Sequence, residues 1–287
     1  MKYVYANIAA ATAATIWGIF FLVAKISLLD LSVFNIIAYR YILACIPFFI
    51  LVFVRSHILD RKIIRNGIIL GIILFVADFF QLTGISLTTV SSSALLSQGL
   101  IIFTPIFLLF LGTKVKKFDF LRAAIAFVGI YLFVVKDALL VSTGDLLVLG
   151  FAVVISIYFI VNEKFVKKSS LIGLLSVQFL TEGLIGLAFS VFIVGLSYPA
   201  TPISWLPILY LGFAATALAW GLSSLAQKTL QSHHVVLIYV LEPLVAGFLA
   251  FVFFSESLMP KELLGAIIIL FAIIMPVLGN WKMKKKY

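Results

Sequence analysis

Ten long runs of apolar residues, separated by short polar connections, extend through almost the whole of this sequence. The runs cover residues 4–24, 32–54, 66–86, 93–112, 120–136, 145–163, 171–196, 203–226, 235–255 and 263–280, of which the fifth and the tenth are short. An α-helix needs roughly 20 apolar residues to cross the hydrocarbon core of a bilayer. The pattern therefore predicts an all-α integral membrane protein with ten transmembrane helices.

The composition agrees with this interpretation. Hydrophobic residues make up 64% of the chain and charged residues 11%, whereas soluble proteins are about half apolar and about a quarter charged. A single soluble core could not bury so much apolar surface at this chain length. The first run, residues 4–24, is longer than the apolar region of a signal peptide and no small-residue cleavage site follows it. We therefore expect it to be a retained span.

The positive charges predict the orientation. Cytoplasmic loops of membrane proteins are enriched in Lys and Arg. With a cytoplasmic N-terminus, the cytoplasmic side holds Lys2, Arg55, Arg61, Lys62, Arg65, Lys114, Lys116, Lys117, Arg122, Lys164, Lys167, Lys168, Lys228, Lys282, Lys284, Lys285 and Lys286. The other side holds only Lys25, Lys136 and Lys261. Both termini are thus expected in the cytoplasm, which requires an even number of spans and accounts for the net charge of +10.

The second half of the sequence resembles the first. The aligned blocks are 71–91 with 212–232, 111–113 with 254–256, and 120–125 with 263–268, with a two-residue shift in register after the first. We therefore expect two five-helix repeats, residues 1–137 and 138–287. Because five is odd, the second repeat must be inverted relative to the first. Inverted repeats recur in secondary transporters, with the substrate site near the middle of the membrane between the halves.

Several short motifs occur in the order and spacing of a known family. They are Trp17-Gly18 with Lys25, Gly84-Ile85-Ser86-Leu87-Thr88-Thr89, Ser93-Ala94-Leu95-Leu96, Pro105, Leu241-Glu242-Pro243, Ser255-Glu256 and Leu264-Gly265-Ala266. Together they resemble the drug/metabolite transporter (DMT) superfamily, in particular its EamA-like ten-helix exporter family. The resemblance implies a ten-helix inverted-repeat carrier with cytoplasmic termini and a central cavity lined mainly by helices 1, 3, 4, 6, 8 and 9. It also implies export of amino acids and related metabolites.

The sequence departs from the family pattern in places. The usual Gly-Glu after the fourth helix is Gly112-Thr113 here, and Asp78 and Glu182 lie outside the pattern. Ionisable residues within membrane spans are costly and mark functional sites by default. Asp78 lies in the middle of the third run, with Gln81 three residues later on the same helical face. We predict that both side chains bind substrate, with a structural carboxylate as the alternative.

A second polar pair occurs where the two halves correspond. Glu242 precedes Pro243 in the ninth run, and proline removes a hydrogen bond from a helix. The equivalent stretch of the first half is Gln98-Gly99. Helix breaks at corresponding places of two halves point to the binding site of a carrier. We predict that Glu242 and Gln98 bind substrate, with a role of the Glu-Pro motif in gating or folding as the alternative, and that Asp78 and Glu242 meet the cationic or amino group of the substrate.

Aromatic residues with a polar tip provide further candidates. Each of Trp17, Tyr158, Trp220 and Tyr239 shares a helical stripe with polar residues, namely Lys25, Asn162, Ser224 with Gln227, and Glu242 respectively. Such side chains suit a cavity for amphipathic solutes, because each combines an apolar ring with a hydrogen-bonding group. We predict that they shape the substrate cavity, with packed or lipid-facing rings as the alternative.

Two charged residues are candidates for ion coupling or for structural charge balance. Glu182 lies in the middle of the seventh run, and desolvation disfavours the charged form of a carboxyl group, so this residue could exchange protons. Arg40 is the one cation in the middle of a span. It could balance a buried negative charge. Because helices 2 and 7 are repeat equivalents, a structural Arg40–Glu182 pair is the alternative.

The expected function is a secondary transporter that exports amino acids or related small metabolites by alternating access, with a lipid or lipid-linked sugar flippase as the alternative. The sequence has no dinucleotide, phosphate-loop or protease-type zinc motif, so we expect neither enzyme activity nor a cofactor.

His233-His234 makes a poor metal pair, because adjacent helical residues point in different directions. The expected partners are a small-molecule substrate, the lipid bilayer and protons, but not nucleic acid. Short loops favour a prokaryotic inner membrane.

Overall fold

A computed structural model describes residues 2–54, 59–112, 117–134, 142–239, 241–256 and 259–283, and every regular element within them is helical. The first half holds α1 (Lys2–Ser27), α2 (Val33–Val54), α3 (Arg61–Leu87), α4 (Val90–Ser97), α5 (Leu100–Phe110) and α6 (Lys117–Val134). The second half begins with α7 (Thr143–Val166), α8 (Leu171–Phe189) and the π-helical turn η1 (Ser190–Val194). It continues with η2 (Pro202–Ser204), α9 (Trp205–Leu209), the π-helical stretch η3 (Tyr210–Leu218), α10 (Ala219–Gln227), α11 (Ser232–Ile238), α12 (Leu241–Phe254) and α13 (Pro260–Met283).

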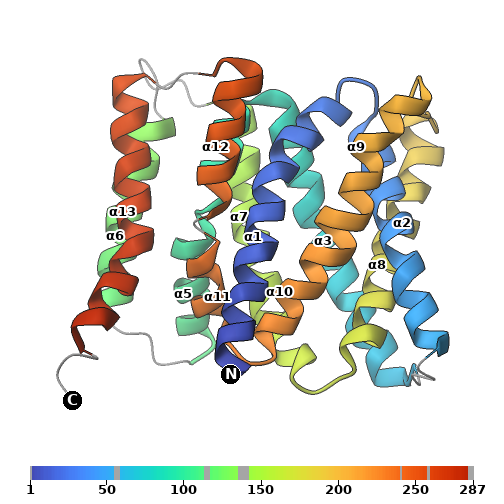
Figure 1. The fold of residues 1–287 in the computed structure, drawn as a ribbon, viewed down its shortest axis with the longest axis horizontal. Helices are drawn as coiled ribbons and strands as arrows, with labels where there is room; N and C mark the ends of the chain where they lie inside the picture. The colour runs from blue at the N-terminus through green and yellow to red at the C-terminus, as the bar shows by residue number, and fades with distance from the viewer. Residues whose placement is uncertain are drawn as a thin grey trace.

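These elements form the predicted ten membrane-crossing segments. Eight segments within the described residues are long and apolar enough to span a bilayer. The other two are α6 and α13, the short fifth and tenth runs, which pack against each other at one side of the bundle (Figure 1). Residues 135 and 136, at the predicted end of the fifth span, lie outside the described residues. The prediction of a ten-helix membrane protein is confirmed.

The chain reverses direction at each segment, so α1 begins and α13 ends at the same end of the bundle (Figure 1). We call this the near end and the opposite one the far end. The described parts of the chain place Arg61, Lys62, Lys168 and Lys228 at the near end, as the charge pattern predicts. That the near end faces the cytoplasm stays a prediction.

Helix α8 lies between α2 and α3 at unusually close contact. A Cβ atom built on Gly71 of α3 would lie 2.8 Å from the backbone oxygen of Gln178. One built on Gly186 of α8 would lie 2.9 Å from the backbone nitrogen of Ala38. Real side chains do not tolerate such distances, so these glycines permit the helices to approach through their backbones. The crossings hold the middle of α8 against the polar residues of α2 and α3.

Candidate substrate-binding site

Two of the spans are broken at corresponding places of the two halves. Helix α4 ends at Ser97 and α5 begins at Leu100, while α11 ends at Ile238 and α12 begins at Leu241. The two breaks face each other, because the Gln98 amide Nε2 donates a hydrogen bond to Glu242 Oε2 at 3.4 Å. Broken spans present backbone and side-chain polar groups in the membrane interior, where carriers hold their substrates.

A small cavity lies beside these breaks in the centre of the bundle. Its volume is about 40 Å³, enough for a few water molecules at the roughly 10–15 Å³ that each requires by this measure. The cavity is lined by Trp17, Phe20, Phe21, Arg40, Asp78, Gln81, Leu100, Phe151, Ile155, Phe159, Trp220, Tyr239 and Glu242. The space is narrow for a metabolite, and we call this arrangement, from which the helices would separate to admit a larger solute, the closed state.

Aromatic rings from four spans meet at this cavity. The ring centroids of Trp17 and Trp220 lie 4.7 Å apart, those of Trp17 and Tyr239 lie 5.1 Å apart, and those of Tyr158 and Trp220 lie 4.9 Å apart. All three pairs are edge-to-face, the arrangement that the ring quadrupoles favour. The Tyr239 hydroxyl is hydrogen-bonded to Ser223 at 2.6 Å. The buried indole Nε1 of Trp220 has no hydrogen-bond partner among the described residues, so it remains a donor for a ligand.

The π-helical stretch η3 supplies two more polar contacts. The indole Nε1 of Trp17 donates to the backbone oxygen of Ala215 at 2.9 Å. The guanidinium Nε of Arg40 donates to the Thr216 hydroxyl at 2.9 Å, and that hydroxyl donates to the Leu211 backbone oxygen at 2.7 Å. A π-helix has wider turns than an α-helix and is often found at functional sites. Here it brings a backbone oxygen to Trp17 and a hydroxyl oxygen to Arg40, which both line the cavity.

A buried charged cluster adjoins the cavity. Arg40 NH1 lies 3.0 Å from Asp78 Oδ2, and each side chain is 2% exposed. The Tyr41 hydroxyl donates to the same Asp78 oxygen at 2.8 Å. Glu182 is fully buried beside Asp78, Arg40 and Tyr41. Asp78 is therefore the ion-pair partner of Arg40, and Glu182 lies next to that pair, so the alternative of a direct Arg40–Glu182 pair is not what this structure shows.

Most of the residues singled out in the sequence meet at this cavity. Trp17, Asp78, Gln81, Trp220, Tyr239, Glu242 and Arg40 line it. Gln98 and Tyr158 lie one layer behind it, since Gln98 contacts Glu242 and Tyr158 contacts the Trp220 ring. The lining comes from spans 1, 3, 4, 6, 8 and 9, and Arg40 adds span 2.

Other site residues were not singled out. Tyr41 and Thr216 hold the charged pair, and Phe20, Phe151 and Phe159 form much of the cavity wall. Tyr41 follows Arg40 directly in the sequence, and this position was the signal that could have identified it. Phenylalanines are common in every span, so nothing in the sequence separates cavity rings from packed ones.

The far end of the bundle is closed by a set of contacts that we call the far clasp, formed by Lys25, Thr88, Val90, Ser91 and Glu256. The Lys25 ammonium donates to the backbone oxygen of Thr88 at 2.8 Å and to two further backbone oxygens at the end of α3. The two carboxylate oxygens of Glu256 accept from the backbone N–H groups of Val90 and Ser91, each at 2.9 Å. The clasp thus fixes the start of α4 to the connection between α12 and α13.

The near end is closed by a corresponding set, the near clasp, formed by Asn162, Glu163, Gln227 and Ser232. Glu163 Oε2 accepts from the backbone N–H of Ser232 at 2.7 Å. Asn162 Nδ2 donates to Gln227 Oε1 at 2.6 Å, and Gln227 Nε2 donates to Ser232 Oγ at 3.2 Å. The clasp joins α7, α10 and the start of α11 at the near end of the bundle.

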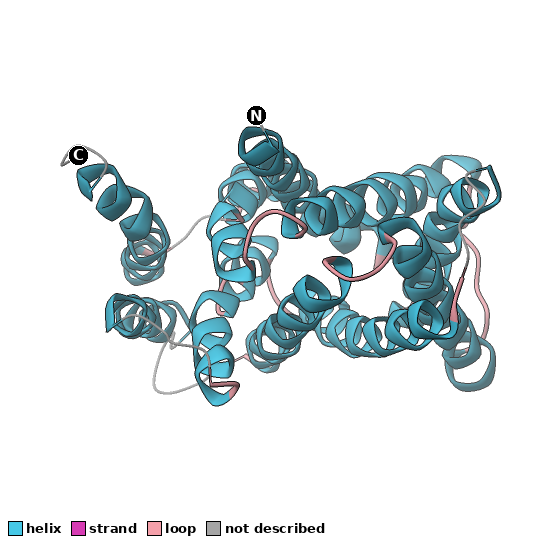
Figure 2. Ribbon diagram, turned by 90° about the horizontal axis from the view of Figure 1, so that it is seen from below, coloured by secondary structure: helices cyan, strands magenta, loops and turns pink. Residues whose placement is uncertain are grey.

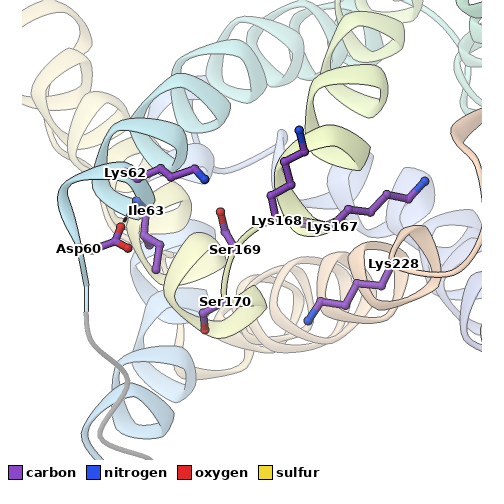
Figure 3. A pocket seen from close by; sticks show the side chains of 9 residues that line it. Asp60, Lys62, Ile63, Lys167, Lys168, Ser169, Ser170 and Lys228 are labelled. Carbon is purple, nitrogen blue, oxygen red and sulfur yellow. Dashed lines mark hydrogen bonds between the residues drawn. The ribbon is translucent and has the colours of Figure 1, made fainter.

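A wider basin of about 570 Å³ lies outside the near clasp. Figure 3 shows its lining, in which Lys62, Lys167, Lys168 and Lys228 surround the turn at Ser169. These lysines belong to the cations that the orientation rule places on one side. The basin lies at the mouth of the bundle rather than between the broken spans. The central cavity lies beside the broken spans and is therefore the candidate substrate site. Figure 2 shows the helices of the bundle viewed from below.

Comparison with known proteins places this geometry in a family. The sequence pattern of the EamA-like transporter family matches residues 4–135 and again residues 142–278. A protein of Archaeoglobus fulgidus described as an uncharacterized transporter is 27% identical over 275 residues, which are 96% of this chain and 86% of the relative. A crystal structure with 17% sequence identity shares the fold, with a TM-score of 0.74 over 97% of this chain and 98% of the other. The chain therefore belongs to the EamA-like transporter family and is a multi-pass membrane transporter rather than an enzyme.

Proposed function

We propose that this transporter exports amino acids or related amino-group-bearing metabolites by alternating access through the central cavity. The observation that carries the proposal is that two side chains with unused hydrogen-bonding capacity line one cavity. Among the described residues, the buried Glu242 carboxyl has one long side-chain hydrogen bond, from Gln98, and the Trp220 indole N–H has no partner. A carboxylate and a free N–H complement the ammonium and the carboxylate of an amino acid.

The aromatic lining supports a cationic solute. The faces of tryptophan and tyrosine rings attract an ammonium group, more strongly where water is excluded. Trp17, Trp220 and Tyr239 converge on the space next to Glu242. The substrate ammonium would lie between Glu242 and these rings, while its side chain would contact the phenylalanines of the opposite wall.

Alternating access follows from the two clasps. Each closes one end of the same cavity, and opening one while the other holds would expose the site to one side at a time. We propose that the halves, residues 1–137 and 138–287, rock against each other to do so. The cavity would then expand to hold the solute.

Counterflow in proteoliposomes tests this function, because exchange requires no assumed driving ion. Vesicles loaded with unlabelled amino acids should take up at least one of them in labelled form. Glu242→Gln should weaken apparent affinity by about ten- to a hundredfold, the value of a charge-assisted hydrogen bond of about 1.5–3 kcal/mol. Ser176→Ala should not, because the Ser176 hydroxyl bonds only within its own helix.

A second variant separates the two ends of the substrate. Trp220→Phe keeps a ring but removes the indole N–H, so it should weaken exchange of amino acids more than exchange of amines that lack a carboxylate. Comparing right-side-out with inverted vesicles gives the direction of transport. If intact, folded protein exchanges no amino acid or amine, the proposal is wrong, and labelled lipid headgroups become the next substrates to assay.

A further inference from the structure

The charged cluster of α2, α3 and α8 contains more acid than base. Arg40 supplies one cation, and Asp78 and Glu182 supply two carboxyl groups. The other ionisable groups that face Glu182 are the phenols of Tyr41 on α2 and Tyr158 on α7. With both carboxyls ionised, this part of the described interior would carry one uncompensated negative charge.

The hydrogen bonds distinguish the two acids. Asp78 accepts a hydrogen bond from Tyr41 and lies in ion-pair contact with Arg40, so its ionised form is stabilised. Neither oxygen of Glu182 has a partner in hydrogen-bond geometry among the described residues. The Asp78 carboxyl and the Tyr41 hydroxyl, which donates to Asp78, lie beside it. An ionised carboxylate buried without donors is very unfavourable, and such a group takes up a proton instead. A protonated Glu182 becomes a donor that faces Asp78.

The helix crossings prevent the cluster from relaxing in another way. Gly71 and Gly186 hold α8 in backbone contact with α3 and α2, so the backbone at Glu182 cannot move away from Asp78 without separating the helices. Arg40 and Asp78 line the cavity, whereas Glu182 is not part of its lining and lies beside Asp78. A proton on Glu182 therefore reaches the cavity past Asp78.

From this geometry we infer that Glu182 and Asp78 form the coupling site of the transporter and hold one exchangeable proton in the closed state. When the cavity opens to water, the Glu182 hydroxyl bond breaks, its proton passes by way of Asp78 to a water molecule, and Glu182 is left as the carboxylate. Opening to the other side reverses the step. The coupling role rests on the proposed transport function, whereas the presence of the bound proton does not.

The bound proton is tested on purified protein, without any substrate. At neutral pH, the infrared spectrum of the unaltered protein minus that of the Glu182→Gln protein should show the carbonyl-stretching band of a protonated carboxyl at Glu182, with the expected small shift in D₂O. Glu182→Gln should abolish this band and Ser176→Ala should preserve it. A band that survives in a folded Glu182→Gln protein would overturn the inference, as would the absence of any such band in the unaltered protein.

The coupling is tested by comparing exchange with net transport. A difference of one pH unit across the membrane should support accumulation of about tenfold for one proton per solute, equivalent to about 1.4 kcal/mol. Glu182→Gln should retain counterflow but lose accumulation driven by the pH gradient. Counterflow without any response to pH in the unaltered protein would refute the coupling and leave the transport function standing. Absence of counterflow would refute the transport function. The infrared experiment alone would then decide whether Glu182 holds a proton.

Discussion

The two ends of the molecule are closed in related but unequal ways. At each end a glutamate accepts hydrogen bonds from the first N–H groups of a half-helix, Glu256 at α4 and Glu163 at α11. Carboxylates are favoured there, because the start of a helix carries a partial positive charge. At the far end, however, the glutamate reaches across from the other half, whereas Glu163 belongs to the same half as α11. Only the far clasp therefore fastens the halves to each other through a carboxylate.

Backbone geometry shows that the difference is one of residue type rather than of fold. Gly112, after α5, has φ +75°, and Ser255, after α12, has φ +53°. These residues are aligned in the repeat and both adopt the left-handed conformation. The next residue is Glu256 in the second half but Thr113 in the first. The near end thus lacks a glutamate at the position that supplies one to the far end, and α11 is held by Glu163 instead.

The largest expected effect comes from Glu256→Gln. It replaces two charge-assisted hydrogen bonds, each worth about 1.5–3 kcal/mol, so the population open at the far end should rise by about tenfold or more. The measurement is the rate at which an impermeant maleimide labels a cysteine at Gln81, in a Cys45→Ser background. Glu262→Gln is the matched control, since Glu262 accepts from Met259 N at the far end. Equal labelling rates for the two variants would show that the far clasp does not restrain opening.

A smaller increase in labelling, at the opposite end of the bundle, is expected for Glu163→Gln. Labelling of the same cysteine from the near end should rise only several-fold, because the Asn162–Gln227–Ser232 bonds of the near clasp do not depend on this charge and retain about 1 kcal/mol each. Lys167→Gln provides the control. Lys167 contacts the other oxygen of Glu163 on a partly exposed surface, where an ion pair contributes little. A change as large as that of Glu256→Gln would contradict the inequality of the two ends.

The smallest effect is expected for Ser255→Gly. A non-glycine residue in the left-handed conformation costs about 1–2 kcal/mol, so the glycine variant should unfold at a slightly higher temperature in detergent and transport normally. The converse change, Gly112→Ala, should lower that temperature. No described atom lies within 4 Å of a Cβ at Gly112, so its cost would come from the backbone alone. Opposite signs in the two thermal shifts would establish that the turns are equivalent.

The spans were largely predictable from the sequence, but their ends were less so. Helix α3 begins at Arg61, five residues before the predicted apolar run, because Asp60 accepts a hydrogen bond from Ile63 N at 2.7 Å and caps the helix. Hydropathy does not count such polar first turns as part of a span. The break at Gln98-Gly99 was visible through its correspondence with Glu242-Pro243. That comparison also found the two residues that face each other in the structure.

The buried charges were found from the sequence, but their partners were not. Which acid meets Arg40 depends on how α3 and α8 are rotated about their axes, and this is set by the glycine contacts between helices. Thr216 could not be singled out, because a hydroxyl in a span has no charge to mark it, and Tyr41 was marked only by its place next to Arg40.

The extra width of η3 also has a rotational meaning. Each residue of an α-helix turns the chain by about 100°, so a stretch that returned from π-helical to α-helical winding would change the angular phase of everything after it. Such a change would turn Thr216 away from Arg40 and Trp220 away from Trp17, two contacts that η3 and α10 make with residues lining the cavity. The π-helical winding of η3 therefore sets the rotation of α10. A change of winding in this one stretch would break the Arg40–Thr216 hydrogen bond and the Trp17–Trp220 ring contact at the same time.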